Sequence, residues 1–358
     1  MNRKYWQNAF GNAPEDFHLR LVETLDGLEE EKMKKRYRFS TVLIAAIIMV
    51  LLAGGAVAVN QLGGVFRLLT YRAEPIVPLE GAEEMVVTDL GFTENDLATL
   101  KVEEAVFDGQ NVMLQLRLTP KDSEHHVMFD YMMQNAPRDL YEIEEIPHED
   151  GSMSIGEITR KDGKQIIDYE IMAKSMDERI YINTADAEEQ EDGGIIYWAK
   201  GEAETGTPVD LDALDVEIKT FLFLNGEEVW MDPITIQVPK AGKLNRVQFV
   251  PVGEQLDRVE ILSAEMDISK LVGYINVNYR YEQLPEEEMG ITFRFYDAEG
   301  NEIHSGDGGS WDQGGMRVWR MEIQPFATDD LPEKIWIEAK VIDGDPLGRI
   351  ECDVVEIS

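Results

Sequence analysis

The chain has 358 residues, of which 70 are Asp or Glu and 33 are Lys or Arg, giving a net charge of −37 at pH 7. A charge of this sign and size repels phosphate backbones, which excludes nucleic acid as a partner. The single cysteine, Cys352, excludes an intrachain disulfide. A large domain in an oxidising compartment would therefore depend on core burial for its stability.

Residues 1–38 are predicted to form a cytoplasmic segment with one amphipathic helix. Phe17, Leu21, Leu25 and Leu28 recur at spacings of four, four and three residues, which places them on one side of a helix. A short isolated helix is marginal in water, so this stripe is predicted to be buried against a partner protein, a second copy or the inner membrane surface. These four side chains are the predicted partner-binding residues, and a merely positioned juxtamembrane helix is the alternative.

Residues 39–66 are predicted to contain a transmembrane helix and its flanks. The apolar part, residues 41–59, has 19 residues, and a helix of that length spans about 29 Å, the thickness of a hydrocarbon core. Five Lys or Arg residues lie within residues 32–38, so the positive-inside bias places the N-terminus in the cytoplasm and the C-terminal bulk outside the cell. The Ala56–Ala58 tripeptide would also suit a signal peptidase, so cleavage after Ala58 is the alternative.

Beyond the apolar run, the hydrophobic pattern changes from helical to alternating. Val112, Leu114, Leu116 and Leu118 alternate with residues assigned to the solvent face, which predicts a strand with one buried side. The preceding KVEEAVFD and its Asp-Gly turn make this strand the second arm of a hairpin. The same pattern recurs in EITRKDGKQIIDYEI, with two alternating runs around a Lys-Asp-Gly-Lys turn.

Many short strands separated by Gly, Asn and Asp turns favour antiparallel sandwiches. We place a boundary after Gly242, which gives a membrane-proximal domain at residues 67–242 and a distal domain at residues 243–358. The predicted fold class is mainly β: an N-terminal amphipathic helix, one transmembrane helix and two antiparallel immunoglobulin-like β-sandwich domains.

Catalytic motifs are absent from the sequence, which contains no G-x-S-x-G, phosphate loop or H-E-x-x-H. We predict that the chain is not an enzyme and has no catalytic, cofactor or metal site. His125 and His126 are neighbours and would point to opposite faces of a strand. The Asp- and Gly-rich residues 297–315 fail the EF-hand pattern and are assigned to a hairpin turn and a flexible loop, with a weak cation site as the alternative.

Three tryptophans, Trp311, Trp319 and Trp336, could line a sugar or peptide groove on the distal domain. Trp319 and Trp336 lie inside strand patterns, which favours a place in or near the core.

A resemblance to a group of bacterial proteins adds to this interpretation. The N-terminal WQNAFGNAPEDFHLRLVETLDGLEEEKMKKRYRFSTVLIAAIIMVLLAGGAVAV, followed by VEEAVFDGQNVMLQLRL and ITFRFYDAEGNEI, resembles uncharacterised single-pass proteins of clostridial-type Gram-positive bacteria. Some members of that broader group have a short cytoplasmic head and an immunoglobulin-like exterior, and are suspected to act as membrane anti-sigma factors. The resemblance implies a membrane location and a sigma factor as a possible cytoplasmic partner.

The expected function is envelope sensing, in which acidic extracytoplasmic domains bind an unknown ligand and the cytoplasmic helix engages a regulatory protein. The expected location is the cell membrane, with the bilayer as a partner. A surface binding or structural module with a passive anchor is the main alternative, and an extracytoplasmic hydrolase is a third.

Overall fold

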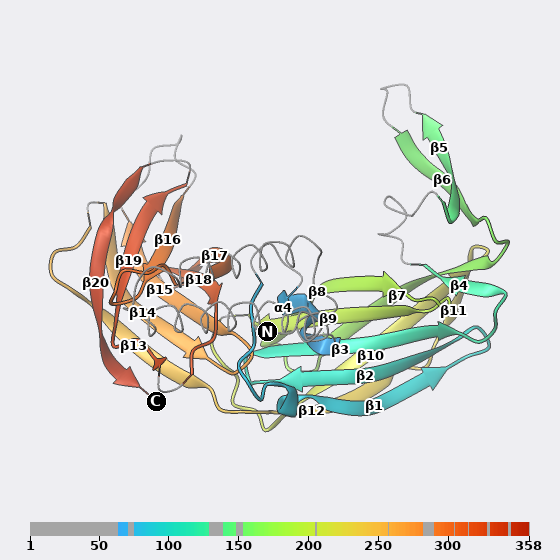
Figure 1. Ribbon diagram of the computed structural model, residues 1–358, viewed down its shortest axis with the longest axis horizontal. Coiled ribbons are helices and arrows are strands. Elements are labelled where there is room, and N and C mark those ends of the chain that lie inside the picture. Colours follow the sequence, from blue (N-terminus) through green and yellow to red (C-terminus); the bar gives the residue numbers. More distant parts are fainter. Residues whose placement is uncertain are drawn as a thin grey trace, which may run out of the picture. The chain divides into compact units, whose positions relative to one another are not determined.

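The chain's structure, a computed structural model, is built almost wholly from β-strands (Figure 1). It describes residues 64–70, 75–128, 139–147, 153–204, 206–256, 258–281, 290–303, 305–313, 315–327, 330–342 and 345–357. The helical elements within these ranges are η1 (Gly64–Phe66), α4 (Arg67–Thr70) and η2 (Glu83–Met85). No helix among the described residues is long and apolar enough to cross a membrane.

The fold class predicted from the sequence is wrong, although its mainly-β part is confirmed. The described residues form three large sheets and one two-stranded sheet, not a long helix followed by two immunoglobulin-like sandwiches. Residues 1–38 and all but the last three residues of the predicted transmembrane segment lie outside the described residues. Those three residues form η1, and its Val65 and Phe66 are buried against β-strands in a mixed apolar cluster.

Two sheets share one core in the first part of the chain, and we call them the two-sheet domain. The first sheet has the strand order β1–β2–β3–β9–β8, and the second has the order β11–β10–β7–β4, with β12 also paired to β10. All pairs are antiparallel except β4 and β7. The strands are β1 (Val87–Glu94), β2 (Ala98–Phe107), β3 (Asn111–Pro120), β4 (His125–Val127), β7 (Gln165–Ser175), β8 (Ile180–Glu189), β9 (Ile195–Ala203), β10 (Ala213–Leu224), β11 (Glu227–Trp230) and β12 (Ile234–Pro239).

One face of each sheet supplies this core. Leu114 and Leu116 of β3 lie in the same buried cluster as Val216 and Ile218 of β10. Alternation along the strands places these side chains on one face, and removing each from water contributes about 1.5–3 kcal/mol. The predicted inward phase of β3 is therefore confirmed.

The second part of the chain forms one continuous eight-stranded sheet, which we call the eight-stranded domain. Its strand order is β16–β19–β20–β13–β14–β15–β18–β17, and every pair is antiparallel. The strands are β13 (Asn245–Val252), β14 (Val259–Ile268), β15 (Gly273–Tyr281), β16 (Ile291–Tyr296), β17 (Ser305–Gln313), β18 (Met316–Ile323), β19 (Lys334–Val341) and β20 (Pro346–Ile357).

This sheet curls around its own core as a half-barrel (Figure 1). The ring centroid of Phe293 in β16 lies 4.9 Å from that of Tyr279 in β15 and 6.0 Å from that of Trp319 in β18. Strands far apart in the sheet order thus contact each other across the concave face. Register shifts in the β13–β20, β14–β15 and β19–β20 ladders supply local bends. A sandwich consists of two sheets, whereas here a single eight-stranded sheet bends over its own core.

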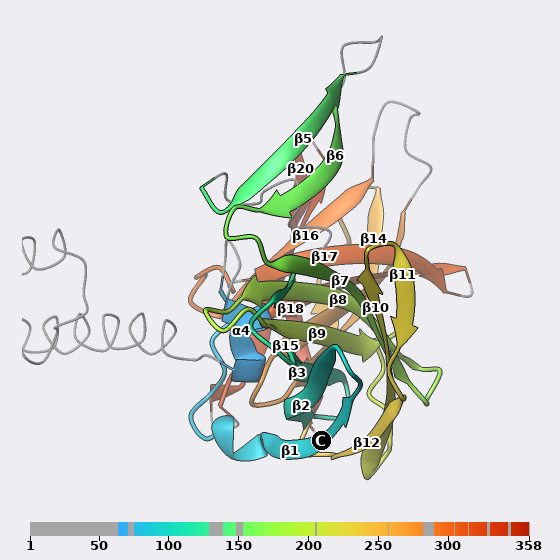
Figure 2. The ribbon, with the colours of Figure 1, turned by 90° about the vertical axis from the view of Figure 1, so that its right-hand side faces the viewer.

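A separate hairpin stands on the two-sheet domain, and its strands pair only with each other among the described residues (Figure 2). The strands are β5 (Tyr141–Pro147) and β6 (Met153–Arg160). The buried Tyr141 hydroxyl donates to the Glu189 carboxylate at 2.9 Å and accepts from Arg160 Nη1 at 3.0 Å. His126 Nε2 lies 3.0 Å from Glu189 Oε2. Glu189 therefore ties the base of the hairpin to β4 and β8.

Glu189 should make the stability of this hairpin base depend on pH. Burial raises the pKa of Glu189, but hydrogen bonds with His126 and Tyr141 more than offset it, so the pKa lies below its ordinary value of 4.5. Because the pKa of Glu189 is lowered in the folded state, its carboxylate stabilises the fold at pH values above the ordinary pKa. This stabilisation is lost as the pH falls through the pKa of the folded state. We expect Glu189→Gln to lower the urea midpoint at neutral pH and to have less effect below pH 4.5. A deficit that stays constant, or one matched by the exposed Glu142→Gln, would contradict this role.

Candidate functional site

The two domains meet at two turns that share a buried carboxylate. Asp108, in the β2–β3 turn, is 1% exposed, and its Oδ1 accepts the backbone N–H groups of Gln110 and Asn111 at 2.8 and 2.6 Å. The Ser269 hydroxyl, in the β14–β15 turn, donates to Asp108 Oδ2 at 2.6 Å. Gly109 has a φ of +94°, a conformation that side chains rarely adopt. A side chain of the eight-stranded domain thus donates a hydrogen bond to the turn of the two-sheet domain.

A buried ion pair lies beside these turns. Lys200 of β9 and Glu322 of β18 are 4% and 7% exposed, and the Lys200 ammonium contacts Glu322 Oε1. The Tyr274 hydroxyl lies 3.1 Å from the same oxygen and also bonds Asn111 Oδ1. Burial and the neighbouring Glu322 carboxylate raise the pKa of Tyr274 well above its ordinary value, so it stays a neutral hydroxyl. Charged and neutral groups of both domains therefore form one network.

Arg320 of β18 extends this network. Its guanidinium carbon lies 3.8 Å from the centroid of the Tyr274 ring, and its Nη1 donates to the Ala203 carbonyl at 3.4 Å. Its Nη2 lies 3.9 Å from Glu202 Oε2. Gly206, with a φ of +69°, passes so close that a Cβ there would lie 2.3 Å from Nη1. The absence of a side chain at residue 206 is needed for this fit.

The residues that follow the apolar run are fastened to the two-sheet domain. We call residues 64–70 and 75–86 the strap. The Trp198 indole N–H, on the outer face of β9, donates to the Gly64 carbonyl at 2.9 Å, and the Val65 N–H donates to Glu104 Oε2 at 2.8 Å. Arg67 stacks on the Trp198 ring at 4.4 Å and pairs with Asp186 at 3.3 Å.

The second half of the strap is fastened to the eight-stranded domain. Gln324 donates from Nε2 to the Pro75 carbonyl at 2.6 Å and accepts the Val77 N–H at 2.9 Å. The Leu79 N–H donates to the Lys270 carbonyl at 2.8 Å. The strap also joins both domains in one buried apolar cluster: Val65, Phe66, Leu69, Ile76, Ala82, Met85, Val106, Met113, Leu271, Val272 and Tyr274. We refer to the strap, this cluster and the polar network together as the joint.

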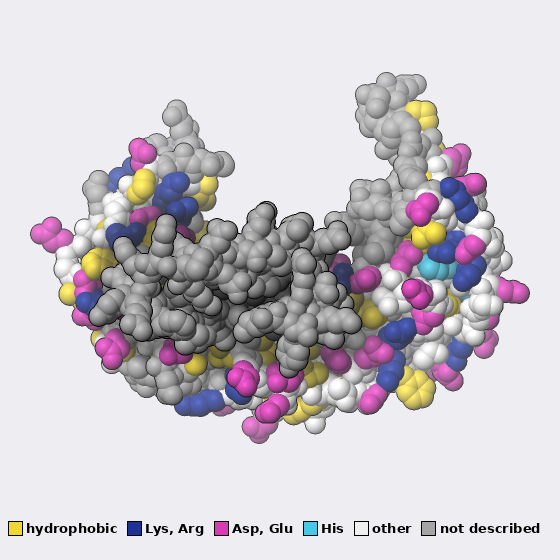
Figure 3. Space-filling model, viewed as in Figure 1, with side chains coloured by type: hydrophobic (Ala, Val, Ile, Leu, Met, Phe, Trp, Pro, Cys, Tyr) yellow, Lys and Arg dark blue, Asp and Glu magenta, His cyan; other side chains and the backbone are white. Residues whose placement is uncertain are grey.

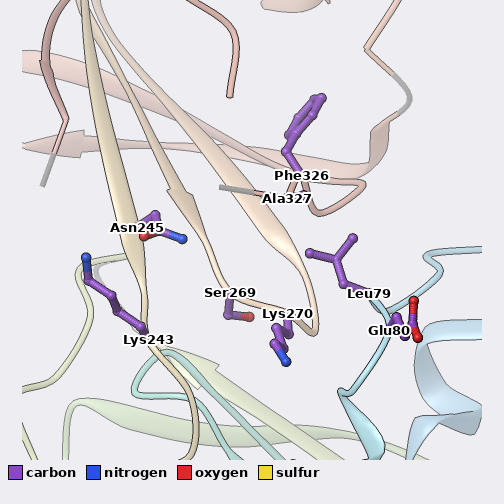
Figure 4. A pocket seen from close by; sticks show the side chains of 8 residues that line it. All are labelled: Leu79, Glu80, Lys243, Asn245, Ser269, Lys270, Phe326 and Ala327. Carbon is purple, nitrogen blue, oxygen red and sulfur yellow. The ribbon is translucent and has the colours of Figure 1, made fainter. Parts of the chain in front are cut away.

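A pocket of about 340 Å³ opens at the joint (Figure 4). Its lining comes from the strap, the start of β13, the β14–β15 turn and the segment after β18. The residues are Leu79, Glu80, Lys243, Asn245, Ser269, Lys270, Phe326 and Ala327. Because the strap and the β14–β15 turn both help to hold the domains together and line the pocket, we take the joint as the candidate functional site.

The sequence did not single out the joint. The predicted partner-binding residues Phe17, Leu21, Leu25 and Leu28 lie outside the described residues. The Asp-Gly turn at Asp108 was recognised only as a turn. Its contact with the second domain had no sequence signal.

The histidines and tryptophans considered as possible binding residues make contacts within the fold. His125 lies 2.8 Å from Asp122, and His126 is held by Glu189, so each histidine has its own carboxylate. No group of His, Cys, Asp and Glu suited to a metal occurs within the part of the chain that the structure describes. Trp319 belongs to the core of the eight-stranded domain, whereas Trp311 and Trp336 are half-buried.

The Gly-rich segment predicted as a flexible loop contains a strand. Asn301 donates its N–H to Asp297 Oδ1 at 2.8 Å, which closes the expected turn. Beyond it, Ser305–Gln313 forms β17 and pairs with β18. The Cβ of a side chain at Gly308 would lie 3.0 Å from the Trp319 ring, so this glycine allows close packing across the strand pair.

Cys352 is a buried core residue of β20. Burial raises the pKa of its thiol to about 12, so the nucleophilic thiolate is scarce at neutral pH. We expect the native chain to resist a disulfide-exchange reagent such as dithiobis(nitrobenzoate) and to react at this one thiol after unfolding in urea. Rapid stoichiometric labelling of the native chain would contradict this burial.

Comparisons with known proteins give no family. A scan against protein-family models finds no match, and a search among curated proteins finds no similar sequence. A conserved domain protein from Bacillus anthracis, of solved structure, is similar over 83% of this chain and 97% of its own, at 10% identity and a TM-score of 0.48. The N-terminal periplasmic domain of ScsB from Proteus mirabilis is similar over 75% of this chain and 98% of its own, at 10% identity and a TM-score of 0.20. The resemblance to clostridial single-pass regulators stays a prediction.

Proposed function

We propose that this chain is a single-pass membrane protein of the cell envelope whose acidic β domains lie outside the cell and sense a ligand there. Its N-terminus lies in the cytoplasm, where the stripe of Phe17, Leu21, Leu25 and Leu28 engages a regulatory protein. An RNA polymerase sigma factor is the candidate partner, as in the anti-sigma-like proteins that the sequence resembles. The net charge of −37 and the single buried cysteine suit an exterior of this kind.

The observation that carries this proposal is the attachment of the strap. The apolar run at residues 41–59 ends shortly before Gly64, where the Trp198 indole binds the chain. Gln324 of the other domain then binds residues 75 and 77. A ligand that shifts the packing of the two domains therefore acts on the residues that lead to the apolar run. A passive anchor would need no such double attachment.

The test is capture of a sigma factor by the full chain expressed in a Gram-positive host. The wild-type chain should retain a specific sigma factor, and Leu21→Asp combined with Leu25→Asp should abolish retention because charged groups replace the apolar stripe. Leu19→Asp makes the same chemical change off the stripe and should leave retention intact. Equal retention by all variants, or none by the wild type, would favour a surface binding module with a passive anchor.

Location is tested separately by protease treatment of intact cells. The proposal expects the β domains to be digested from outside while residues 1–38 stay protected. Protection of the β domains, or release of a chain that begins at Val59, would overturn it.

A further inference from the structure

The pocket at the joint offers two kinds of lining. Leu79 and Phe326 are half-buried apolar side chains and lie on the same side of the pocket (Figure 4). The Asn245 side chain projects from β13 opposite them, and Ser269 lies between. A volume of about 340 Å³ lies within the range of small-molecule sites, roughly 300–1,000 Å³. A compact ligand with an apolar body and a polar end fits this lining.

The charge at the pocket is opposite to that of the chain as a whole. Asp and Glu outnumber Lys and Arg by 70 to 33 in the sequence, and acidic side chains are spread widely over the face shown in Figure 3. The lining of the pocket, by contrast, contains two lysines, Lys243 and Lys270, and one acidic residue, Glu80. Neither lysine forms an ion pair with another described residue. Their ammonium groups lie apart from each other (Figure 4), and each is carried on a flexible four-carbon stem.

The pocket also touches the groups that hold the joint together. Ser269 donates to the buried Asp108. The Lys270 carbonyl accepts the Leu79 N–H, and a Cβ at Gly81 of the strap would lie 2.9 Å from Lys270 Nζ. A ligand in the pocket therefore contacts the strap and the β14–β15 turn together.

We propose that this pocket binds a small organic anion with an apolar body, such as an aromatic or branched carboxylate. The apolar body packs on Leu79 and Phe326, and the carboxylate is held by Lys243 or Lys270. If the proposed function holds, and this inference rests on it for biological meaning, such an anion is the ligand that the exterior senses. Binding stabilises the joint because the ligand bridges the strap and the β14–β15 turn, whose Ser269 donates to Asp108 of the two-sheet domain.

Fluorine NMR of a probe tests the site directly. We would add 4-(trifluoromethyl)benzoate to the full chain in lipid nanodiscs and follow the width of the fluorine line. The carboxylate should broaden in a saturable way, whereas the neutral 4-(trifluoromethyl)benzyl alcohol should broaden far less. Lys243→Gln combined with Lys270→Gln should weaken probe binding by about tenfold, and Phe326→Ala should weaken both probes. Lys219→Gln, on an exposed face of β10, should change nothing.

Equal broadening by the two probes would overturn the assignment of an anion. Binding that is unchanged in the double lysine variant and in Phe326→Ala would overturn the site, as would no broadening by either probe. The two lysines are exposed, so their replacement leaves the fold intact. The proposed function is tested at residues 1–38 and this site at the joint, so either proposal can fail alone.

Discussion

Replacing Asp108 with alanine should lower the free energy of unfolding by about 3–5 kcal/mol, because it leaves several buried hydrogen-bond donors without an acceptor. The substitution removes the acceptor for the backbone N–H groups of Gln110 and Asn111 and for the Ser269 hydroxyl. These groups are buried between two domains, where water cannot readily replace the carboxylate. Urea denaturation of the full chain, followed by tryptophan fluorescence, measures the loss.

The control for this prediction is Asp210→Ala, which removes the same side chain from an exposed position. It should change the free energy of unfolding by no more than about 0.5 kcal/mol. Ser269→Ala should show a smaller loss than Asp108→Ala, since it removes only one of the donors. If Asp108→Ala behaves like the exposed control, the carboxylate does not link the two turns.

Replacing Lys200 with methionine should cost about 3–5 kcal/mol, because it leaves the Glu322 carboxylate buried without its ammonium group. Combining Lys200→Met with Glu322→Leu should recover most of that loss, since a buried ion pair can be exchanged for apolar side chains at little net cost. The four chains form a double-mutant cycle, and denaturation midpoints give the coupling.

The matched control is the exposed pair Arg280–Glu260, whose atoms lie 3.7 Å apart and whose side chains are 57% and 52% exposed. Its cycle should give a coupling between 0 and about 1 kcal/mol. A coupling between Lys200 and Glu322 as small as that of the control would show that the two domains do not depend on this contact.

Alternation along β3 predicted one face of the strand but not the other. Leu114 and Leu116 are fully buried, as expected from their spacing. Met113 and Gln115 were assigned to solvent, yet Met113 is also fully buried and Gln115 is 8% exposed. The strap covers this second face and hydrogen-bonds Trp198 beside it. Period-two patterns show which residues share a face, but not what another segment places over it.

The sequence also located turns without giving their pairing. The runs on either side of residues 161–164 are strands β6 and β7, as the alternation indicated. However, β6 pairs with β5 and β7 pairs with β10, so this turn leads from one sheet into another. In the second half of the chain, the alternation predicts six of the eight strands but neither β14 nor β17. It also does not predict that they form one eight-stranded sheet, because the bending of a sheet has no period of its own.

The joint had the weakest sequence signal. Ser269 and Asp108 are 161 residues apart, and Lys200 and Glu322 are 122 residues apart. Local spacing cannot connect such partners in a chain with 70 acidic residues, since any one carboxylate resembles the rest. Charged residues inside apolar strands, such as the lysine in IIYWAKGEA, are the local signal that could indicate a buried charge.

Amide hydrogen exchange in the strap shows whether the joint transmits a change from one domain to the residues after the apolar run. Gln324→Ala removes the bonds from the eight-stranded domain to Pro75 and Val77. We expect faster exchange at residues 64–70, which are held by the two-sheet domain, as well as at residues 75–79. Gln237→Ala, on β12 away from the joint, should alter neither. Faster exchange confined to residues 75–79 would show instead that the two halves of the strap respond independently and that the joint transmits no change.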